Sequence, residues 1–240
     1  MKIRDLLKAT THRPWDLPEG KWKYYQEWNN AVFLHWKVDI ADLRKFVPED
    51  LEIDLFEGRP WVSLVAFTMN RIRPRNLPAF AAISDFHEVN IRTYVRKKAK
   101  TGAYFLSIEG GNTLSCKIAR IVSKLPYRYS RITRQENKYH SANKSFSDEL
   151  LIHYNVGRHI TEKNSLDKWL TERYALYQDT PTSIHQFEVH HTEWPIRELS
   201  LHQLRVKYPR FEELLSNSPD CVQFSPGVQV LAWDKTSESR

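Results

Sequence analysis

The sequence predicts a β-rich α+β fold, made mainly of antiparallel strands arranged as a barrel or a folded sheet. Segments rich in aromatic and β-branched residues outnumber the segments with helical spacing. The helical segments do not alternate with strands in a βαβ rhythm, so a parallel sheet is not indicated. No internal repeat or low-complexity tract points to another architecture.

Length and composition favour a single domain, because barrel domains reach about 200–250 residues and this chain has 240. We expect an arm over residues 1–20, a barrel-like domain over 21–234 and a tail over 235–240. A hydrophobic share of 41% and an aromatic share of 12% supply enough apolar surface for a substantial core.

The two cysteines, Cys116 and Cys221, have no neighbouring Cys or His at metal-ligand spacing. We therefore expect no disulfide framework, no metal and no cofactor, and a reducing compartment, the cytoplasm. No segment approaches the ~18–20 apolar residues of a spanning helix, and the N-terminus lacks the apolar stretch of a signal peptide. We expect no membrane partner.

In the first third of the chain, Pro14, Pro18 and Gly20 interrupt any regular element of the arm. Residues 23–38 are predicted as one long strand or two short ones, and Asp39 caps a short helix that ends at Pro48. Residues 51–56 and 61–73 are expected to form a hairpin. Both faces of its second arm, Val62 to Met69, are largely apolar, so that strand should be central.

A second hairpin is predicted from residues 85–98 and 103–111, with a solvated basic tip at Arg96, Lys97, Lys98 and Lys100. Counting by two places a carboxylate, an amide, a guanidinium and a phenol on one strand face. These are Glu88, Asn90, Arg92 and Tyr94. Such a face is either the outside of a sheet or the polar lining of a cavity.

The rest of the chain mixes helices with strands. Asn112 caps a helix over 113–125, which Pro126 ends and whose apolar stripe comprises Leu114, Ile118, Ile121, Val122 and Leu125. Strands are predicted over 127–140 and 148–156, followed by a second amphipathic helix over 165–178 capped by Ser165. A strand over 182–194, a further helix over 198–206, a short segment at 222–224 and a closing strand over 228–234 complete the chain.

Several motifs resemble the YqjF-like family of uncharacterised bacterial proteins. They are RPWDLPEGKWKYYQEWNNAVFLHWKV, VPEDLEIDLFEGRPWVSLVAFTMNRIR, HEVNIRTYV, and GAYFLSIEGGN followed by a helix and ARIVSKLPYRYSRI. The resemblance runs from about Arg13 to the closing strand. It implies an acetoacetate decarboxylase-like fold, a cone-shaped barrel around a small cavity, and supports the barrel expected from the residues.

The resemblance implies less about chemistry, because one fold hosts many functions. In acetoacetate decarboxylases, a lysine beside a second lysine just after the helix forms a Schiff base with the substrate. The corresponding stretch here is Ser123-Lys124-Leu125-Pro126, which lacks the adjacent pair. A neighbouring positive charge lowers the pKa of such a nucleophile, so Lys124 is a poor candidate. Enzymatic activity and catalytic residues are left open.

Six residues are candidates for ligand binding: Glu88, Asn90, Arg92, Glu109, Arg120 and Tyr127. Glu88 and Arg92 form either the polar end of a cavity or a structural ion pair across the barrel wall. Glu109 and Arg120 either join them or hold the turn at Tyr127. His185 and His191 share a strand face but lie roughly 20 Å apart, so they predict no metal site.

The sequence thus favours a protein that binds a small organic molecule in a barrel cavity, with an anion as one option. The alternative is a non-catalytic interaction module that uses the basic exterior, since the net charge is +7. Nucleic-acid binding ranks third and is not expected, because the basic residues are scattered. Homo-oligomerisation, ligand identity and reaction type are left open.

Overall fold

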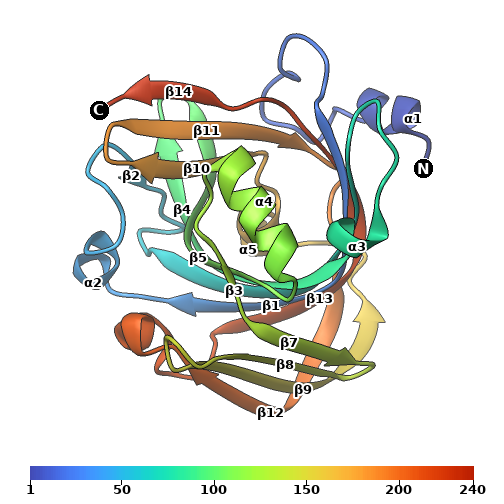
Figure 1. The fold of residues 1–240 in the computed structure, drawn as a ribbon. Coiled ribbons are helices and arrows are strands. Elements are labelled where there is room, and N and C mark those ends of the chain that lie inside the picture. Colours follow the sequence, from blue (N-terminus) through green and yellow to red (C-terminus); the bar gives the residue numbers. More distant parts are fainter.

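Strands dominate the computed structural model, which describes residues 1–240 apart from the side chain of Val122. Figure 1 shows most of them curled into a barrel-like ring, with a further layer of strands packed along one side. Nearly all neighbouring strands run antiparallel. The predicted β-rich α+β barrel with a few peripheral helices is therefore confirmed.

Seven strands form the ring, in the order β1-β3-β4-β5-β10-β11-β13 and back to β1. Their bounds are β1 Tyr24–Lys37, β3 Trp61–Pro74, β4 Phe86–Lys97, β5 Lys100–Gly110, β10 Ala175–Thr180, β11 Ser183–His190 and β13 Cys221–Ala232. The ring closes unevenly. β5 and β10 run parallel and share two residue pairs, and β11 meets β13 only at Val189–Ala232 and His190–Leu231.

The second layer continues the sheet beyond β13 with β12 (Arg197–Lys207), β9 (Asp148–His159), β8 (Lys138–Asn143) and β7 (Arg131–Gln135). Figure 1 shows these strands below β1 and β3. Leu34, Leu64 and Ile91 on the outer face of the ring share one core with Leu150 and Ile152 of this layer. One layer of apolar side chains therefore stabilises both the ring and the second layer.

β3 occupies the centre of this arrangement, as its two apolar faces predict. It pairs with β1 on one side and β4 on the other, so that Leu64 lies between Leu34 and Ile91. Leu64 is fully buried. The second hairpin, β4 with β5, is also confirmed. Its basic tip is less solvated than expected, because Lys97 and Lys98 pair with Glu238 and Lys100 pairs with Glu188.

The helices are short and lie at the periphery of the ring. They are α1 Ile3–Lys8, α2 Ile40–Arg44, α3 Ala81–Ser84, α4 Thr113–Ser123, α5 Ser165–Thr171, the 3-10 turn η1 Pro209–Phe211 and α6 Glu212–Leu215. Asp39 and Asn112 cap α2 and α4, as predicted. Figure 1 shows α4 lying across the open face of the ring. Within the described residues, no helix has both the length and the apolar character that crossing a membrane requires.

Two expected helices differ from the structure. The segment expected to form a helix over 198–206 is β12, paired with β9. A register shift between Leu201 and Gln203 breaks the period-two pattern, so the apolar residues imitate helical spacing. The helix expected over 165–178 ends at Thr171, and its cap is Asn164 rather than Ser165. The following residues form β10, which closes the ring beside β5.

The short strands also differ from expectation. β2 (Glu52–Ile53) pairs with β4 instead of forming a hairpin with β3, because β1 and β4 already occupy both edges of β3. β14 (Thr236–Ser239), in the segment expected as a tail, pairs with β11. The arm contains α1, although proline and glycine interrupt it further on. A last short strand, β6 (Tyr127–Tyr129), runs parallel to β5.

Candidate functional site

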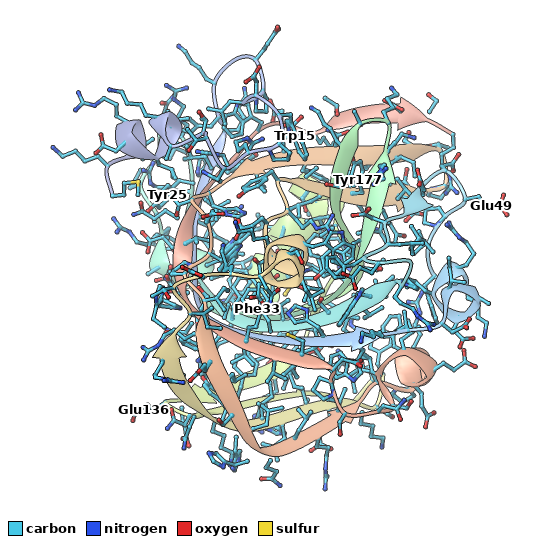
Figure 2. All side chains as sticks on the ribbon, turned by 180° about the vertical axis from the view of Figure 1, so that it is seen from behind. Trp15, Tyr25, Phe33, Glu49, Glu136 and Tyr177 are labelled. Atoms are coloured by element: carbon cyan, nitrogen blue, oxygen red, sulfur yellow. The ribbon has the colours of Figure 1, made fainter. Side chains whose placement is uncertain are left out.

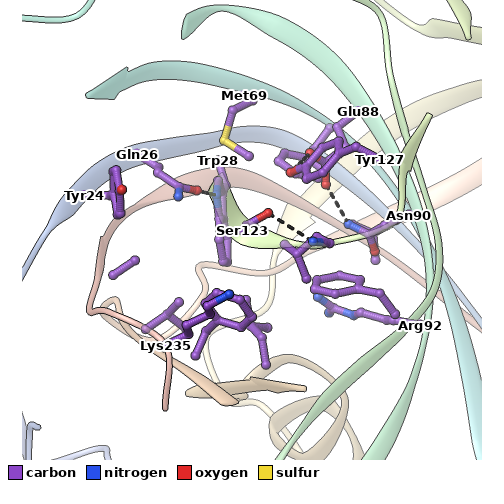
Figure 3. A pocket seen from close by; sticks show the side chains of 18 of the residues that line it. Tyr24, Gln26, Trp28, Met69, Glu88, Asn90, Arg92, Ser123, Tyr127 and Lys235 are labelled. Carbon is purple, nitrogen blue, oxygen red and sulfur yellow. Dashed lines mark hydrogen bonds between the residues drawn. The ribbon is translucent and has the colours of Figure 1, made fainter. Parts of the chain in front are cut away.

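The inner face of β4 carries three polar side chains into the ring. Glu88, Asn90 and Arg92 alternate with Val89 and Ile91, which point outward into the apolar core beside the second layer. The three polar residues line a cavity of about 210 Å³ (Figure 3). The strand period that predicts their common face therefore also places them in one site.

Most of the cavity wall is apolar and aromatic. Its aromatic members include Trp28 and Phe33 from β1, Phe67 from β3, Phe105 from β5 and Trp194 from the segment after β11. Figure 2 labels Phe33 near the middle of the ring. A small molecule in this cavity would contact aromatic side chains on several sides and polar groups along β4. Further polar groups in the wall come from Gln26, Ser123, Tyr127, Asp234 and Lys235.

Arg92 brings a buried positive charge to this apolar space. Arg92 is 7% exposed, and its guanidinium carbon lies 5.8 Å from the centroid of the Phe33 ring. No carboxylate of the described residues lies within ion-pair distance of it, and its Nε is closed off from solvent without an acceptor. A guanidinium stays protonated in proteins. Arg92 therefore lacks the anion that a buried cation normally contacts.

Glu88 does not supply that anion. Its Oε2 accepts a hydrogen bond from the Tyr127 hydroxyl at 2.9 Å, and its Oε1 accepts one from Asn90 Nδ2 at 3.1 Å. Burial raises the pKa of Glu88 to about 7, although both hydrogen bonds and the charge of Arg92 oppose the rise. Near neutral pH this carboxyl group can therefore hold or release a proton. The structural ion pair considered for Glu88 and Arg92 does not form.

Tyr127 reaches the cavity because α4 ends just before it. Lys124 closes the helix with a left-handed φ of 61°, and the chain then enters β6 beside β5. Ser123 and Leu125 line the cavity, whereas Lys124 between them does not. Burial, followed by the neighbouring Glu88, raises the pKa of the Tyr127 hydroxyl well above its usual value. It therefore acts toward Glu88 as a donor.

The two other candidate residues lie elsewhere. Glu109 accepts hydrogen bonds from Arg128 Nη2 at 3.0 Å and from Ser141 Oγ at 3.2 Å, on the side of β5 that faces the second layer. Arg120 is exposed on α4 and lies outside the cavity wall. The structure thus brings together Glu88, Asn90, Arg92 and Tyr127, but not Glu109 or Arg120.

The two histidines of β11 and the adjacent His191 have different partners. His185 Nδ1 lies 2.8 Å from Ser237 Oγ, and His190 Nε2 lies 2.8 Å from the Leu6 carbonyl oxygen. His191 Nδ1 lies 2.7 Å from the Thr192 carbonyl oxygen. Among the side chains that the structure describes, no three His, Cys, Asp or Glu residues converge as metal ligands.

Sequence reasoning missed part of the cavity wall. Tyr24, Gln26 and Trp28 alternate along β1 and all line the cavity, and Trp28 Nε1 donates to Gln26 Oε1 at 2.8 Å. This period-two alternation is visible in the sequence and could have identified the three residues. Trp194 and Lys235 also line the cavity, but both lie outside the strands of the ring. No local pattern marks them.

Comparison with solved structures shows the same fold at low sequence identity. An acetoacetate decarboxylase superposes with a TM-score of 0.62 at 15% identity, covering 99% of this chain and 97% of that chain. An acetoacetate decarboxylase-like enzyme from Sphingomonas wittichii RW1 gives a TM-score of 0.61 at 11% identity, covering 91% and 94%. The expected acetoacetate decarboxylase-like fold is confirmed.

Sequence comparison shows a closer relationship. The uncharacterized protein YqjF of Bacillus subtilis (strain 168) is 36% identical over 185 residues, which is 74% of this chain and 76% of that protein. Residues 25–229 match the model of DUF2071, a family described as an uncharacterized conserved protein. Because this match spans most of the ring and the whole second layer, the chain belongs to the DUF2071 family and is a relative of YqjF.

Proposed function

We propose that this protein binds a small organic anion in the cavity of the ring, with the anionic group on Arg92. The observation that carries the proposal is the buried guanidinium without a carboxylate partner in a cavity whose wall is mostly apolar and aromatic. Its planar fork of donors matches a carboxylate, which can accept two parallel hydrogen bonds. The aromatic wall suits a ligand whose remaining atoms are apolar.

Proteins of the same fold support this assignment. A structure of the enduracididine biosynthesis enzyme MppR, which superposes with a TM-score of 0.53 at 14% identity, is complexed with pyruvate. Pyruvate is a small carboxylate. The fold thus accommodates ligands of the class that Arg92 would take.

We do not extend the proposal to a decarboxylase mechanism through Lys124. That mechanism needs an amine whose pKa is lowered by a neighbouring cation, and the residues beside Lys124 are Ser123 and Leu125. These neighbours, and not Lys124, line the cavity.

Proton transfer to or from the bound ligand is a second candidate function. The observation that favours it is the Glu88 carboxyl group, whose pKa of about 7 lies where a general acid or base works best. It shares the face of β4 with Arg92. A ligand held by its carboxylate on Arg92 would extend along β4 toward Glu88.

Tryptophan fluorescence offers a direct test, because Trp28 and Trp194 line the cavity. Acetate, acetoacetate and benzoate would be titrated into the wild type, Arg92→Gln and Arg131→Gln. Arg131 is an exposed arginine of β7 and serves as the matched control. We expect saturable binding of at least one acid, weakened by about tenfold or more in Arg92→Gln, which corresponds to about 1.4 kcal/mol.

Unchanged binding by Arg92→Gln would contradict the proposal, as would the absence of saturable binding by the wild type. Thermal melting of the three proteins separates a binding defect from a folding defect. Replacing an unpaired buried cation with an amide should leave the melting temperature equal or higher.

A further inference from the structure

Arginine side chains with a buried, unpartnered nitrogen occur at five described positions: Arg13, Arg92, Arg128, Arg134 and Arg173. Three of them nevertheless contact a carboxylate. Arg13 pairs with Glu188, Arg128 with Glu109 and Asp148, and Arg173 with Asp54. Only Arg92 and Arg134 have no acidic partner among the described residues. A buried arginine without an acidic partner marks the cavity of the ring, and Arg134 is a second arginine of this kind.

Arg134 lines a groove of about 410 Å³ between the ring and the second layer, which we call the β7 groove. Six strands contribute to it. The contributing residues include Asn30 of β1, Thr68 of β3, His87 of β4, Arg134 of β7, Tyr154 of β9 and Phe224 of β13. A surface assembled from strands this far apart in sequence is held in place by the fold rather than by a mobile loop.

The polar side of the β7 groove is cationic. Arg134 Nη2 donates to the Tyr154 hydroxyl at 2.7 Å, while its Nη1 meets no acceptor. His87 Nδ1 lies 3.0 Å from Thr68 Oγ1. Burial together with the charge of Arg134 lowers the pKa of His87, so its imidazole is neutral at neutral pH. The acid of this groove, Glu136, is exposed at the outer edge of the molecule (Figure 2).

Another part of the β7 groove is apolar. It consists of Val156 and the rings of Tyr154 and Phe224, whose centroids are 6.2 Å apart. An occupant that satisfies both sides carries an anionic group and a compact apolar body. A free inorganic anion would use the cationic side alone.

We propose that the β7 groove is a second binding site, for a carboxylate with an apolar or aromatic body, distinct from the cavity of the ring. The carboxylate would lie against Arg134 and His87, and the body against Tyr154 and Phe224. The two sites are on opposite faces of β4, because His87 faces the groove while the adjacent Glu88 faces the cavity. The proposal does not depend on the ligand of the cavity.

The imidazole of His87 reports on this site alone. Its resonance, assigned with a His87→Gln variant, would be followed by NMR over pH with and without saturating benzoate. An anion within about 4–6 Å stabilises the protonated imidazole, so benzoate should raise the pKa of His87 by roughly one. We expect this rise in the wild type, in Arg92→Gln and in the surface control Arg131→Gln, and its loss in Arg134→Gln.

Arg134→Lys provides a second variant, because it keeps the positive charge beside Tyr139 but removes the planar fork. It should retain the fold and bind benzoate several-fold more weakly than the wild type. A rise in the pKa of His87 that persists in Arg134→Gln would overturn the proposal. So would its absence from the wild type, or an equal rise with inorganic phosphate, which has no apolar body.

Discussion

Glu88 and Arg92 show how the same burial acts on two kinds of charged side chain. The carboxyl group responds by holding its proton, since burial raises its pKa to about 7. The guanidinium cannot release its proton and stays charged without a partner. Glu88 and Arg92, four positions apart on one strand, thus supply a group that exchanges a proton near neutral pH and a group that attracts an anion.

The raised pKa of Glu88 predicts a dependence of stability on pH. Below pH 4.5 the group is neutral in both the folded and unfolded states. As the pH rises from 4.5 to about 7 the unfolded chain ionises first, so this group lowers the free energy of unfolding, and the loss is complete above pH 7. The difference between 4.5 and about 7 corresponds to up to about 3 kcal/mol.

Glu88→Gln removes this pH-dependent loss of stability and keeps a buried polar group of similar shape. Urea unfolding of both proteins at pH 4, 6 and 8 should show the wild type losing stability relative to Glu88→Gln as the pH rises. Asp148, whose pKa burial raises to about 6, titrates in both proteins and cancels in the difference. A difference that stays constant over this range would show that the pKa of Glu88 is the same in the folded and unfolded states, and would contradict the prediction.

Among the elements, β3 and α4 carry equally clear apolar patterns but occupy different environments. Both faces of β3 are buried, between the cavity and the second layer. The stripe of α4 points outward, with Leu114 54% and Ile121 70% exposed; Val122 of that stripe lies outside the described side chains. The small residues Ser115 and Cys116 face the ring instead, where a Cβ on Gly110 would lie 2.6 Å from Cys116 Sγ.

The buried position of β3 and the exposed stripe of α4 predict a large and a small response, respectively, to a polar substitution. Leu64→Asp should abolish soluble folding, because it places an unpaired charge in the core at a cost of several kcal/mol. Ile121→Ser should change the free energy of unfolding by no more than about 0.5 kcal/mol, as expected for a surface position. Thermal melting and soluble yield measure both. A cooperative wild-type transition for Leu64→Asp, or a strong destabilisation by Ile121→Ser, would contradict the assignment of the two elements.

These elements also show how far sequence patterns reach. Alternation along β4 is enough to place Glu88, Asn90 and Arg92 on one face, and two apolar faces are enough to make β3 central. Periodicity does not show which neighbour an apolar stripe or a strand face contacts. The exposure of the α4 stripe and the position of Glu109 on the side of β5 that faces the second layer are therefore decided only in the assembled sheet. The bulge in β12 hides its strand pattern, and Trp194 reaches the cavity only because the ring closes around it.

At the scale of the whole molecule, the arm covers one of the two junctions at which neighbouring strands of the ring share only two residue pairs. Arg13 Nη1 donates to the Val189 carbonyl oxygen at 2.7 Å, and the Leu6 carbonyl lies 2.8 Å from His190 Nε2. Val189 and His190 are the residues through which β11 meets β13. The arm therefore stabilises the junction that completes the ring.

Arg13→Ala should weaken this junction selectively. The side chain is buried, pairs with Glu188 at 3.5 Å and lies over the Tyr174 ring, so its loss should destabilise the fold by about 2 kcal/mol. Hydrogen exchange followed by mass spectrometry should show faster exchange in peptides covering 187–191 and 230–233 than in β1 and β3. The exposed Arg4→Ala is the matched control. Uniformly faster exchange over all strands would show that the arm has no local role.

The position of the arm also orders events in time. During synthesis residues 6–13 emerge well before their hydrogen-bond partners at Val189, His190 and His191, which lie 176 to 184 residues further along the chain. Contacts at such separations form late, because a long loop must close before they contribute. A segment that is synthesised early is thus among the last to complete its contacts, and it lacks these hydrogen bonds until β11 and His191 have been synthesised.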